Sequence, residues 1–390
     1  MTLGFYYHIP VTVKDEHIFV PGYLGVFLDA LAKEVDTLYL FMHEANEQQS
    51  LEDDYELLQH NIIFINLGST TPAWYRHLFH KKILSQLLPA SKKCDAILIR
   101  SPTPLAPFFS KFSGGAKLIF MVVGNYMEGA KQFKIKSPRD WLMVHYLKRN
   151  DFLFRKAMST TDVLVNAAML LKTYATCAKS IHLIGTTTLT DADFFFRGDT
   201  CKNEIVQILY TGRIEIAKGL FELVEAIKKL NTLKLKVRLH IAGWEPNGEN
   251  IIEKALLQKA IELNIEGAII FHGRKKIGEA LNALYRMADI YVIPSYHEGF
   301  PRTIWEAMAN SLPVIATSVG GIPDYLIHQE NALLIKPKSS ADITSKISML
   351  IDDKALRIKL IKNGYQLAKY NTIDVQTKKL VTTIQTLLSE

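Results

Sequence analysis

The stretch from Ile290 to Leu326 constrains the fold more than any other part of the chain. It reads IYVIPSYHEGFPRTIWEAMANSLPVIATSVGGIPDYL. Apolar runs at 290–294 and 312–316 have the length and composition of buried strands, and residues 303–310 between them have helical spacing. A polar loop follows each strand. The pattern therefore predicts a strand–loop–helix–strand–loop unit of a parallel α/β sheet.

This stretch also carries residues suited to binding a sugar nucleotide. Glu298 lies in the first loop, Glu306 in the helix and Gly320-Gly321 in the second loop. Ligands of open parallel sheets bind at the carboxyl ends of the strands, and the start of the helix near Thr303 offers N–H groups to a phosphate. Carboxylates accept hydrogen bonds from hydroxyl groups. The alternative is that both glutamates are ordinary surface charges.

The size and composition of the chain indicate two globular domains. The 390 residues are 48% hydrophobic and 22% charged, enough apolar material for two cores. The net charge of +7 suits an anionic partner. The three cysteines (Cys94, Cys177 and Cys201) are widely spaced, which indicates a reducing compartment and no metal or disulfide framework. Without a signal-peptide pattern or an apolar run of spanning length, we expect a soluble or peripheral protein.

Strand and helix patterns alternate along both halves of the chain, which is typical of doubly wound α/β domains. In the first half we expect strands at 3–7, 37–42, 61–67, 96–100, 117–123, 163–167 and 180–184, and helices at 26–34 and 75–88. In the second half we expect strands at 205–210, 237–242, 268–272, 290–294 and 312–316, and helices at 220–230, 251–263, 277–288, 303–310, 343–350, 355–369 and 376–388. The polar, turn-rich segment 197–204 separates the halves. We therefore place an N-terminal domain at 1–198, a C-terminal domain at 199–371 and a final helix at 372–390.

Cations follow two of the strands in the second half. Arg213 comes directly after strand 205–210, and its planar fork can grip phosphate oxygens in bidentate fashion. Lys218 adds a point charge near the start of the next helix. Arg274, after strand 268–272, is a further candidate for a base or a phosphate. Gly25, in the loop after the first strand, is a weaker candidate, because a plain turn explains it equally well.

A basic, aromatic segment at 131–156 suggests a different partner. It has the composition of an amphipathic helix that lies on an anionic membrane surface. An ordinary surface helix with its apolar side on the sheet would have the same pattern. No nucleic-acid motif is present, so we expect no nucleic-acid partner. Asp191-Ala-Asp193 resembles a D-x-D metal site, but so short a pattern is common by chance and we expect no bound metal.

Taken together, the motifs of the second half resemble glycosyltransferase family 4. They are Thr211-Gly212-Arg213, Lys218-Gly219, Ser295, Glu298-Gly299-Phe300-Pro301, Glu306-Ala307-Met308-Ala309, Pro313-Val314-Ile315-Ala316 and Gly320-Gly321. The resemblance covers roughly residues 210–335. It implies the GT-B architecture, in which two Rossmann-like domains with parallel sheets face each other across a cleft. It also implies that the N-terminal domain binds the acceptor, that the C-terminal domain binds the nucleotide donor, and that the last helix crosses back.

The resemblance further implies a role for each matching residue. Arg213 and Lys218 would hold the donor diphosphate, Glu306 the ribose and Glu298 the transferred sugar. The other donor contacts that we expect are Gly25, Arg274, Gly299, Phe300, Pro301 and Thr303. The implied activity is retaining hexosyl transfer, without metal or cofactor, from a UDP-sugar to a saccharide or lipid-linked acceptor in surface polysaccharide or glycolipid assembly. Such an enzyme would be cytoplasmic, in solution or peripheral on the inner face of the plasma membrane.

The N-terminal half departs from this family at one place. Many relatives have a histidine after the strand that corresponds to 117–123, and here residues 121–125 read MVVGN. Asn125 and the loop residue His8 are two alternatives for its role. A non-catalytic nucleotide-sugar-binding relative and a sugar-nucleotide epimerase of the same architecture remain as rival functions.

Overall fold

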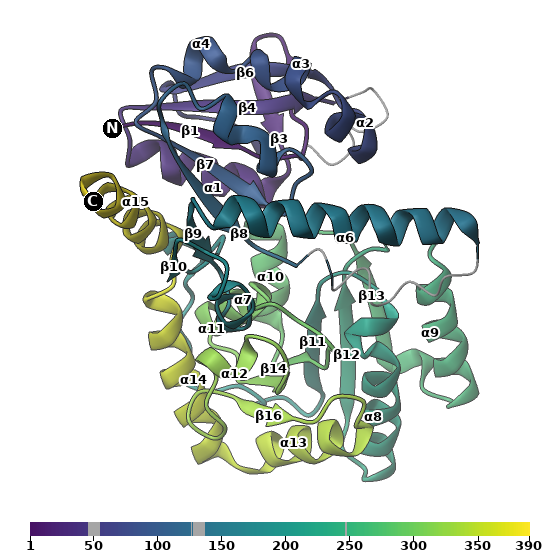
Figure 1. The fold of residues 1–390 in the computed structure, drawn as a ribbon. Coiled ribbons are helices and arrows are strands. Elements are labelled where there is room, and N and C mark those ends of the chain that lie inside the picture. The colour runs from purple at the N-terminus through teal and green to yellow at the C-terminus, as the bar shows by residue number, and fades with distance from the viewer. Residues whose placement is uncertain (46–54, 126, 128–136, 246–247) are drawn as a thin grey trace. The chain divides into compact units, whose positions relative to one another are not determined.

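The computed structural model describes residues 1–45, 55–125, 127, 137–245 and 248–390. The chain forms two compact units (Figure 1). Unit 1 contains Met1–Thr186 and Ile373–Glu390, and unit 2 contains Thr187–Thr372. Each unit is built on its own parallel sheet. The fold class is therefore α/β, as the alternating pattern predicts.

Unit 1 has a seven-stranded parallel sheet in the order β10-β9-β8-β7-β1-β4-β6. Its inner strands are mainly apolar, because helices cover both faces of the sheet, whereas the edge strands β6 and β10 are partly exposed. The interior strand β1 pairs on both sides, with Phe5 opposite Leu40 and Leu98. The strands are β1 (Thr2–Tyr6), β4 (Thr37–Glu44), β6 (Ile62–Ser69), β7 (Ala96–Ser101), β8 (Lys117–Val122), β9 (Asp162–Val165) and β10 (Ser180–Leu183).

Two sets of helices bury the faces of this sheet. One face packs against α1 (Gly22–Lys33) and α15 (Ile373–Ser389). The other face packs against α3 (His80–Ser85), α4 (Leu88–Ser91), η2 (Ala106–Lys111), α6 (Pro138–Met158) and α7 (Ala168–Tyr174). The short helix α2 (Ala73–Leu78) precedes α3. The single helix expected at 75–88 is therefore wrong, because the chain leaves helical geometry at Phe79.

A small antiparallel sheet of unit 1 has no counterpart in the expected elements. It contains β2 (Thr12–Lys14), β3 (His17–Val20) and β5 (Tyr55–Glu56). Asp15 and Glu16 make the turn between β2 and β3 with positive φ angles of 48° and 68°. Glycine or asparagine usually occupies such positions, so this turn could not be recognised from its residues.

Unit 2 has a six-stranded parallel sheet in the order β13-β12-β11-β14-β15-β16. The strands are β11 (Val206–Thr211), β12 (Val237–Ala242), β13 (Ile269–Gly273), β14 (Ile290–Ile293), β15 (Val314–Thr317) and β16 (Leu333–Ile335). The helices are α8 (Leu220–Thr232), α9 (Ile251–Glu262), α10 (Glu279–Met287), α11 (Thr303–Ala309), α12 (Ile322–Tyr325), α13 (Ser340–Asp352) and α14 (Lys354–Lys369). Single 3-10 turns are η3 (Asp191–Asp193), η4 (Ile216–Lys218) and η5 (Glu266–Ala268). Strand β11 lies between β12 and β14, so the loops after β11 and β14 emerge side by side.

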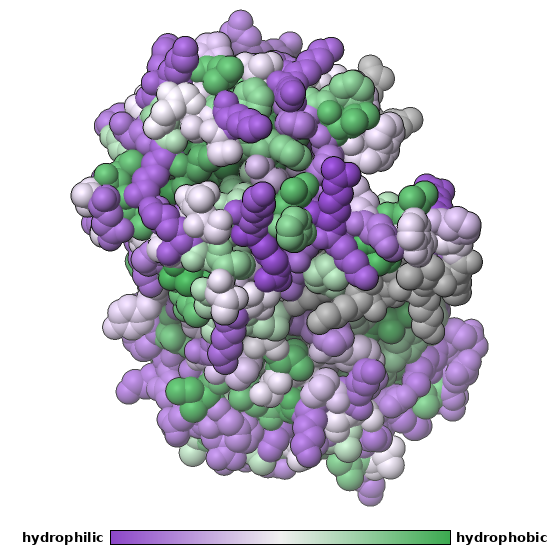
Figure 2. Space-filling view, viewed as in Figure 1, coloured by the Kyte–Doolittle hydropathy of each residue, from purple (hydrophilic) through white to green (hydrophobic). Residues whose placement is uncertain are grey.

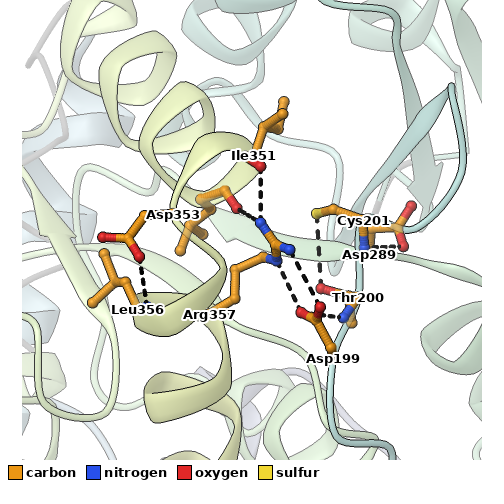
Figure 3. Close-up of polar contacts among 9 residues, drawn as sticks. Asp199, Thr200, Cys201, Asp289, Ile351, Asp353, Leu356 and Arg357 are labelled. Atoms are coloured by element: carbon orange, nitrogen blue, oxygen red, sulfur yellow. Dashed lines mark hydrogen bonds and ion pairs between the residues drawn. The ribbon is translucent and has the colours of Figure 1, made fainter.

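Unit 2 begins at Thr187, before the boundary that we expected at 198/199. The segment between these positions belongs to unit 2 because its backbone is bonded there, and the Phe195 N–H donates to the Ala309 carbonyl at 2.9 Å. Figure 3 shows the next anchor, in which the Arg357 guanidinium of α14 donates to both oxygens of Asp199 at 3.0 and 3.3 Å. Both side chains of this ion pair are buried, so the segment is held firmly.

Hydrophilic and hydrophobic side chains are interspersed on the face of the molecule shown in Figure 2. Within the described ranges, we find no helix with the length and apolar character needed to cross a membrane.

Candidate functional site

The loop after β11 is pressed against the loop after β14. Gly219 has φ +68°, and a Cβ there would lie 2.1 Å from the carbonyl oxygen of Pro294. The Tyr296 N–H donates to the carbonyl of Ala217 at 2.8 Å. Only glycine combines this φ with so close an approach. The two loops therefore form one surface at the carboxyl ends of the strands.

Two of the predicted site residues meet on this surface. The Lys218 ammonium donates to Oε1 of Glu298 at 2.7 Å. The side chains are only 13% and 10% exposed, so the charges are largely withdrawn from water. A largely buried ion pair at the carboxyl ends of parallel strands supplies both a cation for an anionic ligand and a carboxylate for hydroxyl groups.

Arg213 lies on the same loop but makes different contacts. Its guanidinium pairs with Glu215 at 3.0 Å, and its side chain is 53% exposed. A hydrogen bond holds its backbone in place, because the buried Tyr210 hydroxyl donates to the Arg213 carbonyl at 2.8 Å. The structure thus brings Lys218 and Glu298 into contact. The Arg213 guanidinium, five residues earlier in the chain, stays exposed and does not join this pair.

The loop after β15 completes this surface. Gly320 has φ +57°, and a Cβ there would lie 1.7 Å from the Glu298 carbonyl oxygen. The Gly321 N–H donates to the carbonyl of Gly299 at 2.6 Å. Gly320-Gly321 therefore fixes the backbone that carries Glu298. A Cβ built on Gly299 meets nothing within 4 Å, so that position borders open space.

Glu306 lies on α11 and is half-buried. Its Oε2 accepts from the Tyr285 hydroxyl at 2.7 Å and its Oε1 from the Thr188 hydroxyl at 3.2 Å. Burial raises the pKa of this carboxyl, against the opposing effect of Tyr285 and Arg302. Each carboxylate oxygen can accept a second hydrogen bond, so these contacts do not exhaust its capacity to bind hydroxyl groups.

Two tyrosines that could not be picked out from the sequence connect α11 to the end of strand β11. Tyr285 and Tyr291 are fully buried. Thr211 Oγ1 lies 2.7 Å from the Tyr285 hydroxyl, and Tyr291 donates to Thr303 at 2.7 Å. A buried tyrosine hydroxyl usually has a hydrogen-bond partner, so two tyrosines in apolar segments were a hint of a polar network. Which residues are the partners depends on the fold. We name these residues, with Thr211, Thr303 and Glu306, the tyrosine network.

The remaining predicted donor contacts lie in varied settings. The Phe300 ring packs on Trp305 with centroids 4.5 Å apart, next to Pro301. Arg274 lies after the edge strand β13 with its guanidinium 4.9 Å from the Trp244 ring centroid. Gly25 lies inside α1 rather than in a loop, and a Cβ there would meet the Tyr55 ring at 2.1 Å. The expected loop around Gly25 is therefore wrong, since α1 already begins at Gly22.

The Asp191–Asp193 pair that resembles a metal motif has a capping role. Asp193 accepts from the backbone N–H and the hydroxyl of Thr190 at 2.7 and 2.8 Å. Asn282 donates to its other oxygen at 2.7 Å. These bonds fasten the segment to α10.

Known proteins with similar folds and sequences place these residues in context. The chain resembles sucrose-phosphate synthase of Thermosynechococcus elongatus (TM-score 0.73, 18% identity, 100% and 99% of the two chains). It also resembles Anabaena HepE in complex with UDP-glucose (TM-score 0.72, 18% identity, 99% and 100%). The fold is therefore of the GT-B class, with two Rossmann-like units.

Residues 194–367 match the family described as Glycosyl transferases group 1. An uncharacterized glycosyltransferase of Methanocaldococcus jannaschii is 28% identical over 170 residues, which are 44% of this chain and 42% of that protein. Protein CapJ of Staphylococcus aureus is 26% identical over 308 residues, which are 77% and 74% of the two chains. Residues 194–367 are thus similar to the glycosyl transferases group 1 family, and the matched part spans 42% of the length of the archaeal relative.

Proposed function

We propose that this chain is a glycosyltransferase that moves a hexose from a nucleotide-diphosphate sugar to a saccharide or lipid-linked acceptor. The observation that carries the proposal is the Lys218–Glu298 ion pair where the loops after β11, β14 and β15 meet. The group 1 match of residues 194–367 supports the transfer reaction.

The names of similar proteins support the donor and the setting. Anabaena HepE was crystallised with UDP and with UDP-glucose, and a UDP-sugar is the donor that we assign. CapM of Staphylococcus aureus, 30% identical over 162 residues, is a capsular polysaccharide biosynthesis glycosyltransferase. Surface polysaccharide assembly is therefore the setting that we propose.

The charges of the site suit this chemistry. Breaking the bond between sugar and diphosphate builds negative charge on the leaving diphosphate, and Lys218 and Arg213 are the cations to which we assign its stabilisation. When a donor phosphate takes the Lys218 ammonium, Glu298 becomes available to accept hydrogen bonds from the sugar. Glu306, oriented by Tyr285 and Thr188, accepts from the ribose hydroxyls.

The stereochemistry and the metal requirement belong to the same proposal. Acceptor attack on the face that the diphosphate leaves keeps the anomeric configuration, and a diphosphate oxygen takes the acceptor proton. Side-chain cations then perform the charge stabilisation, so we expect turnover to survive EDTA. An inverted anomer in the product, seen by NMR, would contradict the retaining mechanism. Altered donor sugar released without acceptor would indicate an epimerase instead.

Binding experiments test the site residues directly. A thermal-shift screen against nucleotide sugars identifies the donor, because a ligand of the native state raises its apparent stability. Lys218→Ala and Glu306→Ala should then each weaken donor binding by about 1–3 kcal/mol in calorimetry. Lys254→Ala, on the exposed side of α9, is the matched control. Unchanged binding in both site variants would refute the assignment.

We further propose that α6 rests on an anionic membrane surface. Its exposed side combines apolar residues with cations, namely Trp141, Leu142, Lys148, Arg149, Phe152 and Lys156. Arg155, by contrast, is paired with Asp151 at 2.8 Å. Residues 131–136 of the predicted membrane segment lie outside the described ranges.

Vesicles that contain anionic lipid test this contact. Neutralising Lys148, Arg149 and Lys156 together should lower vesicle binding, whereas neutralising the exposed Lys92, Lys93 and Lys111 of the same unit should not. Equal binding by both triple variants would remove the proposal and leave α6 as an ordinary surface helix.

A further inference from the structure

A second polar cluster lies at the carboxyl end of the unit 1 sheet. His8 follows β1, His43 lies near the end of β4 and Arg100 near the end of β7. Arg76 lies on α2, the first helix after β6. These four strands are neighbours in the order β7-β1-β4-β6, so their ends bring the four side chains to one place. We name these residues the His/Arg cluster.

Contacts and electrostatics confirm that the members are close together. The Arg76 guanidinium donates to the His8 carbonyl at 3.2 Å. Burial, with the charges of Arg76, Arg100 and the neighbouring His43, lowers the pKa of His8 to about 4. Burial and Arg76 lower the pKa of His43 to about 4 as well. Both imidazoles are therefore neutral at pH 7, and the positive charge of the cluster comes from the two arginines.

Several polar atoms of the cluster are buried without a partner. His43 is 1% exposed and its Nε2 makes no hydrogen bond, and Arg76 is 7% exposed with an unpartnered Nε. The same holds for His8 Nδ1 and Arg100 Nε. Across the described residues, no carboxylate forms an ion pair with Arg76 or Arg100. A buried guanidinium without a counter-charge is costly, so a bound anion beside Arg76 would stabilise this arrangement.

We propose that the His/Arg cluster binds the phosphate group of a phosphorylated sugar, as part of the acceptor. This inference rests on the proposed glycosyl transfer. Arginine forks bind phosphate oxygens in bidentate fashion, and cations converging from β7 and α2 suit a multivalent anion. His43 Nδ1 faces the Gly68 carbonyl at 3.2 Å and donates to it, so its Nε2 is left to accept from a hydroxyl group. A phosphate beside a sugar hydroxyl satisfies both kinds of group.

Calorimetric titration of the full chain with inorganic phosphate tests the cluster. Arg76→Gln should weaken phosphate binding by about tenfold or more, since it removes a charge-assisted contact. Arg100→Gln, at a less buried position, should also weaken phosphate binding. It is the substitute variant if Arg76→Gln does not fold. Lys93→Gln, an exposed cation of the same unit, is the matched control. Phosphate binding that is unchanged in both arginine variants would overturn the proposal.

A second pair of measurements separates this site from the donor site. Arg76→Gln should still bind UDP as the unsubstituted protein does, whereas Lys218→Ala should lose UDP affinity and keep the phosphate site. If Lys218→Ala abolished phosphate binding instead, the anion would belong to unit 2 and the proposal would fall. If Lys218→Ala kept its UDP affinity while Arg76→Gln still lost phosphate affinity, only the donor site would be refuted.

Competition then identifies the source of the phosphate. Glucose 6-phosphate represents a free sugar phosphate, and a short-chain prenyl diphosphate sugar represents a lipid-linked acceptor. Displacement of inorganic phosphate by either compound, with loss of the effect in Arg76→Gln, supports an acceptor site and assigns its class. Displacement by neither would mean an adventitious ion only.

Discussion

Glu298 and Glu306 are the same residue type but lie in opposite environments. Glu298 is neutralised by the Lys218 ammonium, whereas Glu306 accepts from two hydroxyl groups. A bound phosphate could replace Glu298 as the partner of the Lys218 ammonium, so this ion pair can be exchanged for another. The contacts of Glu306 come from buried residues of unit 2 and orient its carboxylate.

The tyrosine network gives the first prediction. Tyr285→Phe removes the hydroxyl that lies between Glu306 and Thr211, and it leaves a buried carboxylate oxygen without its donor. We expect a loss of about 1–3 kcal/mol in the free energy of unfolding, together with weaker nucleotide-sugar binding. Chemical denaturation and calorimetry measure the two effects. Tyr370→Phe, at a side chain 72% exposed, is the control, and equal behaviour of both variants would contradict the role of Tyr285.

The pKa of His43 gives a prediction about pH. Its pKa is lowered from 6.5 to about 4 by burial and Arg76, so below pH 6.5 the unfolded chain takes up a proton that the folded chain refuses. Neutral His43 therefore contributes fully to the free energy of unfolding above pH 6.5. This contribution, about 3 kcal/mol, is lost as the pH falls towards 4.

His43→Asn tests this prediction. Asparagine keeps an N–H donor for the Gly68 carbonyl but does not titrate, so the variant should lose less stability on acidification. Thermal unfolding in phosphate-free buffer across this range is the measurement. His240, whose pKa is also lowered to about 4, contributes equally in both proteins. The pKa of His8 is lowered in part by His43, so His8 should also lose less stability on acidification in the variant. Parallel stability curves would show that His43 does not titrate as proposed.

At the scale of elements, the site is a product of how three loops pack. Gly219 and Gly320 both lie against a carbonyl of the loop after β14, so that loop is held from two sides. The side-chain chemistry of Glu298 depends on this backbone, because the loop itself has no regular structure to fix it.

Gly320→Ala should displace this loop. A Cβ at Gly320 would lie 1.7 Å from the Glu298 carbonyl, at a φ of +57° that alanine adopts at a cost. We expect lower thermal stability and a loss of donor affinity similar to that of Lys218→Ala. Gly267→Ala, where a Cβ meets nothing within 4 Å, is the control. Unchanged donor binding by Gly320→Ala would mean that the loop does not depend on this packing.

The sequence predicted the regular elements well where their causes are local. The strand expected at 237–242 coincides with β12, because a short apolar run between turns needs no distant contact to be recognised. The break between α2 and α3 could not be predicted, since no glycine or proline marks it. There the His80 ring stacks on Phe108 at 3.9 Å, a contact between distant parts of the chain.

The same reasoning applies to the sites. Lys218, Glu298 and Glu306 could be named in advance because their spacing follows the strand–helix order. The tyrosine network and the His/Arg cluster as whole sets could not, because each depends on the strand order of its own sheet and on a helix packed beside it. In unit 2 this brings Thr211 to Tyr285 of α10, and in unit 1 it brings His8 to Arg76 of α2. Polar partners that come from four different elements leave no periodic pattern in a sequence.

At the scale of the whole molecule, α15 belongs to the core of unit 1. It contacts α1 and buries Leu380, Ile384 and Leu387 in the cluster that includes Leu28. Ile384→Ala should lower the free energy of unfolding by about 2–5 kcal/mol. Val375→Ala, at a side chain 45% exposed on the same helix, should change it little. Hydrogen exchange of the α1 amides is the measurement, and equal exchange in both variants would contradict the role of α15.

The division of unit 1 into two chain segments has a consequence for biosynthesis. Residues 187–372 are inserted between the first segment and α15, so the ribosome makes all of unit 2 before the helix that completes the unit 1 core. Domains generally fold in the order in which they are synthesised. Here unit 2 can complete its folding before unit 1 does, because the apolar surface of α1 stays uncovered until α15 has been synthesised. A chaperone that shields this surface during translation would act on the earlier-made unit, not on the later one.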